Sequence, residues 1–391
     1  MNYKFYPLAY PSDRPPTIDD STTSALDSAI ELVSVQAIDT ALQQSHTRRI
    51  GGANSIQNQN SVLEAINRFM PNSNVGAVQT ARPSFSGTTA FLAGGRGYNG
   101  AVSASVGFSF DSETSYPIDL RLSELRSYMG TLNSPSSGVF AGGSGFASGV
   151  SKFIDIIKFA LPSISRAGAT LSEALFTTCG VGDAVNGFLL GGSFNTGVTT
   201  RSIDRFNHQS GVSSPSASQL STGRSAPHNG LSSRTEGAIL GGSGSVFGTF
   251  NSAMTSVEII DFNTEQMTIA GTNLTYPHIA HAAFGDKSVG YVCGGMASAT
   301  NIYSDLITKY THTTRTTAPL SVRLQEPKIC CDGIGSGRAG YIMGGDTALS
   351  QWLGTTGVDK IQYGAIESVS RLGSQLGFKV ADQGAVSDFN A

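Results

Sequence analysis

Two glycine-rich segments have the residue spacing of a nucleotide-binding loop. Residues 95–100 and 335–340 both match the pattern G-x-G-x-x-G. In dinucleotide-binding proteins this pattern joins a strand to a helix, and the N-terminus of that helix holds the pyrophosphate. Here each match lies between two expected strands, and 47 of the 391 residues are glycine, so chance matches are expected. The sequence therefore predicts no nucleotide cofactor.

Histidine and tyrosine side chains gather at one place in the second half of the chain. Tyr276, His278 and His281 stand where an expected strand begins, and His228 has a similar place four residues after Arg224. A copper or zinc site needs several such ligands, and no second cluster of His, Cys or Tyr completes a set. We interpret these residues as structural and predict no metal site and no other cofactor.

The remaining reactive side chains are scattered. Acidic residues beside expected strands occur singly, where an aspartate supports a turn, and they do not form the carboxylate pair of a glycosidase. They are Asp111, Asp155, Asp204, Asp261 and Asp359. Four cysteines are too few and too irregularly spaced for a disulfide framework or a zinc site. They are Cys179, Cys293, Cys330 and Cys331. These observations predict a protein that is not an enzyme.

The overall composition excludes two further classes of partner. Charged residues make up 14% of the chain and the net charge is −3, with no basic run to displace counterions from a nucleic acid. No stretch approaches the roughly eighteen apolar residues of a membrane span. The first residues lack the apolar segment of a secretory signal, so we expect synthesis in a cytoplasm.

The elements that would position any site follow from a repeat. A short apolar run that ends in two glycines occurs seven times, about fifty residues apart, and this period indicates an array of units. The glycine pairs are Gly51 and Gly52, Gly94 and Gly95, Gly142 and Gly143, Gly191 and Gly192, Gly241 and Gly242, Gly294 and Gly295, and Gly344 and Gly345. Glycine permits positive φ and a close backbone approach, so we interpret these residues as structural.

Each unit has the same internal order. A polar loop follows the glycine pair, then an alternating strand closed by an aromatic residue, as in residues 203–206 and 259–262. A polar turn, another short strand and a strand of small residues complete the unit. Four short strands bounded by turns are typical of one propeller blade.

An arginine recurs at one position of the unit, where a repeated contact explains it better than catalysis does. It follows a leucine in the pairs Leu220 with Arg224 and Leu320 with Arg323. The members of this set are Arg82, Arg126, Arg224 and Arg323.

These features resemble the kelch repeat over residues 49–391. The matching features are the apolar run with its double glycine, the aromatic residue that closes the third strand, the Asp/Asn turn and the arginine that follows. The tryptophan of that repeat is absent from the fourth strand, since the one tryptophan, Trp352, falls in a loop. The resemblance implies a β-propeller, and it implies that a histidine after the recurring arginine is hydrogen-bonded within its blade.

The two ends of the repeat region set the expected number of blades. The first copy, residues 49–52, has no inner strand before it, whereas 376–383 resembles an inner strand with no glycine pair after it. Residues 358–363 and 366–372 supply the two strands between. We therefore predict an all-β, seven-bladed kelch-like propeller over residues 45–391, closed by the C-terminal strand beside residues 49–52.

The region before the repeats differs in composition. Residues 1–24 are rich in proline, Asp, Ser and Thr, which predicts an extended arm. Apolar residues recur at helical spacing over residues 24–44, which predicts a short amphipathic helix, although residues 30–35 also fit a strand. We predict that residues 1–44 are an anchoring or docking segment.

The loops after the glycine pairs are the expected binding surface. They are polar, with isolated aromatic residues, and loops on a rigid scaffold commonly carry function. The candidate anchors are Tyr98, Phe146, Phe247, Phe250 and Trp352. Plain solvated loops without a ligand are the alternative.

Three functional classes compete. We expect a structural or adhesion protein of a virion, present in several copies as part of a phage tail, fibre or head appendage. It would dock on other virion proteins through residues 1–44 and present its loops to a protein or a host-surface glycan. The first alternative is a cytoplasmic kelch scaffold or adaptor, and the second is a propeller enzyme such as a copper oxidase or sugar mutarotase.

Overall fold

The computed structural model describes residues 89–97, 100–145, 149–160, 162–225, 229–244, 253–297, 302–348, 354–364 and 366–387. The chain divides into two units, Met1–Val78 and Gln79–Ala391, and every described residue belongs to the second. The expected arm, the expected helix over residues 24–44 and the pair Gly51 and Gly52 lie outside the described residues. Every element within those residues is a β-strand.

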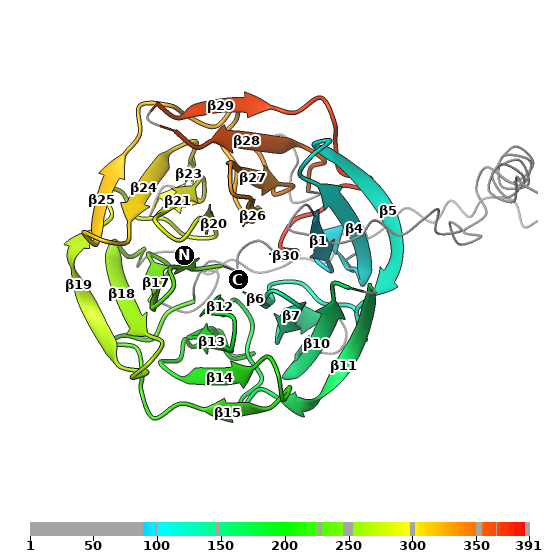
Figure 1. Ribbon diagram of the computed structural model, residues 1–391, viewed down its shortest axis with the longest axis vertical. Coiled ribbons are helices and arrows are strands. Elements are labelled where there is room, and N and C mark those ends of the chain that lie inside the picture. The colour runs from blue at the N-terminus through cyan, green and yellow to red at the C-terminus, as the bar shows by residue number, and fades with distance from the viewer. Residues whose placement is uncertain are drawn as a thin grey trace, which may run out of the picture. The chain divides into compact units, whose positions relative to one another are not determined.

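The strands form six antiparallel four-stranded sheets, the blades, around a central axis (Figure 1). From the inner to the outer strand, blade 1 is β30 (Gly384–Ser387), β1 (Thr89–Ala93), β4 (Ala104–Ser109) and β5 (Thr114–Arg121). Blade 2 is β6 (Gly130–Asn133), β7 (Ser137–Ala141), β10 (Phe153–Lys158) and β11 (Ser163–Thr170). Blade 3 is β12 (Cys179–Gly182), β13 (Asn186–Leu190), β14 (Ile203–Asn207) and β15 (Ser213–Pro215).

The other three blades repeat this order. Blade 4 is β16 (Leu231–Ser232), β17 (Glu236–Leu240), β18 (Ser256–Asp261) and β19 (Met267–Asn273). Blade 5 is β20 (Ala282–Gly285), β21 (Val289–Cys293), β24 (Ile307–Thr311) and β25 (Thr316–Pro319). Blade 6 is β26 (Asp332–Gly335), β27 (Ala339–Met343), β28 (Val358–Gln362) and β29 (Ser368–Arg371). The expected four-stranded unit is therefore confirmed.

The described residues close a ring of six blades, and the expectation of seven is not met. The C-terminal strand β30 pairs with β1, from Ala90 opposite Ser387 to Ala93 opposite Gly384. It also contacts the inner strands on either side, β6 and β26. Closure by the C-terminal strand is thus observed, but at the Gly94–Gly95 copy rather than beside residues 49–52. The inner strand begins at Gly384, and the predicted strand over residues 376–383 is the connection that leads to it.

The apolar residues of each sheet pack against the next blade, which explains why the strands carry apolar residues on both faces. Phe188 of β13 stacks on Phe262, which follows β18 of the neighbouring blade, with ring centroids 5.7 Å apart. Phe110 and Tyr341 stack in the same way between blades 1 and 6, at 5.4 Å. Such contacts bury apolar area around the whole ring and provide the main favourable free energy of the fold.

The glycine pairs have the backbone conformation expected of them. All six described pairs have positive φ, for example 67° at Gly294 and 86° at Gly295. A Cβ atom at Gly294 would lie 2.7 Å from the carbonyl oxygen of Lys328. Only glycine fits there without strain, because both the φ angle and the close approach exclude a side chain.

A belt of backbone hydrogen bonds links blades 3, 2, 1, 6 and 5 next to the axis. The residues of this belt each stand shortly before an inner strand and have positive φ angles between 53° and 59°. They are Tyr128, Thr177, Ala280, Cys330 and Asp382. The N–H of Thr177 donates to the carbonyl of Tyr128 (2.8 Å), and the N–H of Tyr128 donates to that of Asp382 (3.0 Å). Asp382 donates to Cys330, and Cys330 to Ala280, both at 2.8 Å. These residue types share no pattern, so the sequence gives no sign of the belt.

Candidate functional site

The two ends of the propeller differ in their connections. One end, here called the turn end, carries the short turns between inner and second strands, at residues 134–136, 183–185, 233–235, 286–288 and 336–338. The opposite end, the loop end, carries the longer connections that follow the glycine pairs. In blades 1, 2 and 5 these loops contain small hairpins: β2 (Arg96–Gly97) with β3 (Gly100–Ala101), β8 (Ser144–Gly145) with β9 (Gly149–Val150), and β22 (Met296–Ala297) with β23 (Ile302–Tyr303).

The five predicted aromatic anchors all lie outside the described residues. They are Tyr98, Phe146, Phe247, Phe250 and Trp352. The described residues on either side of each of these segments belong to the loop end. The roles and contacts of the five aromatic side chains stay a prediction.

The bases of these loops are held by described backbone contacts. Gly97 pairs with Gly100, and Gly145 pairs with Gly149. In blade 4, Ser243 and Ala253 form an isolated bridge. In blade 6, the N–H of Gly354 donates to Oδ1 of the buried Asp346 at 2.8 Å. Each segment with a predicted anchor thus starts and ends on a fixed frame.

Exposed apolar side chains also lie at the loop end, and of these the sequence analysis named only Tyr276, as a possible metal ligand. Leu125, Val198, Tyr276 and Ile302 are between 40% and 63% exposed. Val185, Val212 and Ile366 are exposed at the turn end, so apolar exposure alone does not distinguish the two ends. Leu125 and Tyr276 stand in connections between blades, which the search of glycine-pair loops could not reveal.

The first G-x-G-x-x-G match contains a structural arginine. Arg96 Nη2 lies 2.5 Å from Asp346 Oδ2 and 3.0 Å from Asp382 Oδ2, and both carboxylates are fully buried. Burial alone would lower the pKa of Arg96, but Asp382, Tyr128 and Asp346 together raise it. The segment lies in a hairpin, and the second match spans the turn between β26 and β27. The interpretation that both matches lie between strands is confirmed.

The recurring arginine position is occupied by several residue types. Arg224 Nη1 donates to the carbonyl of Gly241 at 2.9 Å, and its Nη2 pairs with Glu258. Arg126 makes the same contacts with Gly142 and Asp155. These arginines join the glycine pair to the third strand of their blade, so the predicted repeated contact is confirmed for both.

Arg323 does not belong to this set, which corrects the sequence interpretation. Its side chain is 45% exposed and lies 3.7 Å from Asp305. The equivalent residue is Lys328, which is fully buried and lies 2.9 Å from Asp359. Leu324, not Leu320, packs on the glycine pair of blade 5, as Leu220 does on that of blade 3. The residue four positions later, Lys328, is therefore the equivalent of Arg224. Arg82 lies outside the described residues.

A histidine occupies the same position in blade 5. His278 Nδ1 lies 2.7 Å from the carbonyl oxygen of Gly294, a contact within the blade. His278 takes the place of the arginine rather than following it, and His228, which follows Arg224, lies outside the described residues, so the hydrogen bond expected of a histidine after the arginine stays a prediction. Burial lowers the pKa of His278. His281 packs edge-to-face against it, with centroids 5.7 Å apart, whereas Tyr276 is partly exposed. Within the part of the chain that the structure describes, no group of three or more His, Cys, Asp or Glu residues could hold a metal ion.

The four cysteines are buried, free thiols. Burial raises the pKa of each, so the nucleophilic thiolate is scarce at neutral pH. We expect a thiol reagent such as Ellman's reagent to modify none of the four in the folded protein and all four after denaturation. Rapid modification of even one thiol under native conditions would contradict this assignment and indicate a reactive cysteine.

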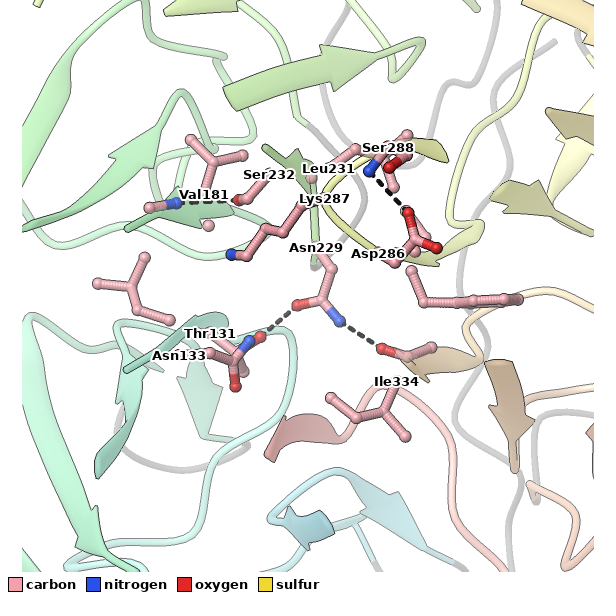
Figure 2. A pocket seen from close by; sticks show the side chains of 18 residues that line it. Thr131, Asn133, Val181, Asn229, Leu231, Ser232, Asp286, Lys287, Ser288 and Ile334 are labelled. Atoms are coloured by element: carbon pink, nitrogen blue, oxygen red, sulfur yellow. Dashed lines mark hydrogen bonds between the residues drawn. The ribbon is translucent and has the colours of Figure 1, made fainter. Parts of the chain in front are cut away.

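A pocket of about 260 Å³ lies on the axis and is lined by the inner strands of blades 2 to 6 and the turns beside them (Figure 2). Asn229 crosses the axis here. Its Nδ2 donates to Asp332 Oδ1 (2.5 Å) and to the carbonyl of Gly333 (2.9 Å), and its Oδ1 accepts from the hydroxyl of Thr131. One side chain thus bridges blades 2, 4 and 6, and forms one wall of the pocket.

The turn between β20 and β21 brings charged residues to this pocket. Lys287 lines it, and burial lowers the pKa of its ammonium, an effect that Asp183 opposes and Arg234 adds to. Oδ1 of Asp286 accepts from the N–H groups of Ser288 (2.7 Å) and Val289 (2.9 Å), which fixes the turn. The sequence analysis missed this pocket. The available signal was the small-residue composition of the inner strands, which leaves space along the axis.

These observations define the class of the protein as an all-β propeller, with six blades in the described residues. No protein-family model matches the chain, and no curated protein sequence matches it. No helix among the described residues is long and apolar enough to cross a membrane.

Proposed function

We propose that this protein is a non-enzymatic binding protein whose loop end contacts a protein or a host-surface glycan. The observation that carries the proposal is the held base of each loop with a predicted anchor: Gly97 with Gly100, Gly145 with Gly149, Ser243 with Ala253, and Gly354 with Asp346. Loops with held ends lose less conformational entropy on binding than free ones, so they favour recognition.

The turns at the opposite end are more uniform than the loops, and this difference also supports binding at the loop end. The turns between inner and second strands all have the same length and are stabilised by a serine or aspartate at their first position, for example Ser134, Asp183 and Ser336. The loops at the other end differ in length and composition from blade to blade. Such variation on a constant frame is typical of a surface adapted to binding.

We further propose that the protein is a kelch-like component of a virion, such as a phage tail, fibre or head appendage, docked through residues 1–44. The support is the proline-rich arm before the repeats, the low charge and the polar loops with isolated aromatic residues. Presentation in several copies would convert weak single contacts into high avidity.

A glycan array tests the loop surface. We expect the intact protein to bind at least one class of host-surface glycan, and Trp352→Ala and the double variant Phe247→Ala/Phe250→Ala to bind about tenfold more weakly or less. Ile269→Ala is the matched control, because Ile269 is exposed on the outer strand β19, away from the loop end. Binding that the loop variants leave unchanged would refute the role of the loops.

Deletion of residues 1–44 tests the docking segment separately. The shortened protein should keep the circular dichroism spectrum and melting transition of a folded propeller and should fail to enter particles. Normal incorporation of the shortened protein would exclude the anchoring role.

A further inference from the structure

Blades 3 and 5 carry a histidine where the other four blades carry phenylalanine or tyrosine. The position directly follows the third strand of each blade. Its occupants are Phe110, Phe159, His208, Phe262, His312 and Tyr363. The backbone N–H of His208 donates to the carbonyl of Val185 at 2.9 Å, and that of His312 to the carbonyl of Ser288 at 3.0 Å. Each histidine is therefore held against the turn between the inner and second strands of its own blade.

Both imidazole rings are enclosed by the fold. His208 is 6% exposed and His312 is 5% exposed. Each ring packs edge-to-face on an aromatic residue two positions earlier, with ring centroids 5.6 Å apart for Phe206 and 5.1 Å apart for Tyr310. In the described part of the chain, neither ring nitrogen of either histidine has a hydrogen-bond partner. A neutral imidazole fits such a site better than an imidazolium, because the charged ring would lose water at two N–H donors without replacement.

We propose that His208 and His312 form an acid-sensitive device at the turn end, in which uptake of a proton by either imidazole destabilises its blade. This role is independent of the loop surface proposed above. When a blade opens, its imidazole reaches water and takes up a proton, whereas the closed blade disfavours the charged ring. Acid therefore favours the open form of blades 3 and 5.

Charged groups on neighbouring elements modify this effect without reversing it. Burial is the largest influence on both imidazoles, and it lowers the pKa of each to about 4. In blade 3, Asp183 of the adjacent turn opposes the shift and Lys158 of β10 adds to it. In blade 5, Asp286 opposes the shift and Lys287 adds to it. Each of the two aspartates already accepts from two N–H groups of its own turn, so its charge is partly compensated.

Acid should destabilise the folded ring over a defined pH range. The pKa of a histidine in the unfolded chain is about 6.5, above the value of about 4 in the folded protein. Between these values the unfolded chain binds more protons than the folded one. The stability that the neutral imidazoles contribute is therefore complete above pH 6.5 and is lost as the pH falls toward 4. From pH 7.5 to pH 5.0 the folding equilibrium constant should fall about tenfold or more for each histidine.

Urea titration of the full chain at pH 7.5 and pH 5.0, followed by far-UV circular dichroism, tests the proposal. We expect the acid-induced fall in the folding equilibrium constant to be at least about a hundredfold smaller in the double variant His208→Phe/His312→Phe than in the wild type. The other histidines are present in both proteins, so their effects cancel. Phenylalanine stands at this position in three other blades, so the double variant should fold. An equal acid-induced fall in the two proteins would overturn the proposal.

Tyr363→Phe is the matched control. It places phenylalanine at the same position of blade 6 without removing an imidazole. Burial raises the pKa of Tyr363, so its hydroxyl does not ionise between pH 5.0 and pH 7.5. This variant should keep the acid response of the wild type. A response reduced as far as that of the double variant would show that the histidines are not its source.

NMR of the wild type labelled with ¹³C at histidine Cε1 is a second measurement, which decides even if the double variant does not fold. The signals of His208 and His312, assigned with the single variants His208→Phe and His312→Phe, should titrate in the folded protein at least about one pH unit below 6.5. Titration of both signals near pH 6.5 in the folded protein would overturn the proposal.

Discussion

A chain that ends at Gln383 should have no cooperative unfolding transition at room temperature, whereas a chain that ends at Ser387 should keep it. The shorter chain lacks β30, the inner strand of blade 1. Its loss would leave β1 without its inner partner over four residue pairs. It would also expose the sides of β6 and β26 that β30 covers. Val386, which packs with Phe91 and Phe140, would be lost from the core as well.

The effect should be large because ring closure is shared by all blades. An unpaired inner strand exposes backbone groups and apolar area at once, and a domain is stable by only about 5–15 kcal/mol. Urea titration followed by far-UV circular dichroism is the measurement, with the chain that ends at Ser387 as the control. A sigmoidal transition of the shorter chain, with a midpoint close to that of the control, would show that β30 does not close the ring.

Arg224→Ala should lower the free energy of unfolding by about 3–5 kcal/mol, while Arg323→Ala should change it by less than about 0.5 kcal/mol. Arg224 is buried, and its removal leaves the buried Glu258 without its cationic partner, with only the N–H of Ser221 still donating to it, and the carbonyl of Gly241 without its donor. Burial lowers the pKa of Arg224, and Glu258 opposes this effect. Arg323 is half exposed beside Asp305, where an ion pair contributes little.

The two arginines are a matched pair because both were assigned from the sequence to one blade position. Chemical denaturation of both single variants under the same conditions is the measurement. Similar losses for the two would show that the register through Leu324 and Lys328 is wrong. A small loss at Arg224 would show that the buried ion pair is not needed for the blade.

The local pattern of the sequence was sufficient for the unit of the fold. The glycine pairs, the aromatic residue that closes the third strand and the polar turns each depend on neighbours within a few residues. Residues 203–206 and 259–262 were therefore placed correctly on β14 and at the end of β18. Arg323 was assigned to the wrong position because an arginine close after a leucine also occurs by chance, outside the repeat. Only the contact of Leu324 with the glycine pair distinguishes the two.

The count of blades could not be read in the same way. Seven glycine pairs are present in the sequence, but the pairing of the last strand is a choice between distant partners of similar composition. In the structure β30 pairs with β1, the strand that ends directly before Gly94 and Gly95. The helix expected over residues 24–44 and the aromatic anchors of the loops stay predictions, because they lie outside the described residues.

The sequence by itself determined that the chain forms repeated four-stranded blades, because strand alternation and glycine turns are set by residues close along the chain. Tertiary structure alone decided how many blades close the ring and where a pocket lies. The bridge of Thr131, Asn229 and Asp332 joins residues 98 and 103 positions apart, and Arg96 meets Asp382 across 286. Contacts over such separations depend on how the blades pack around one axis, which no local pattern encodes.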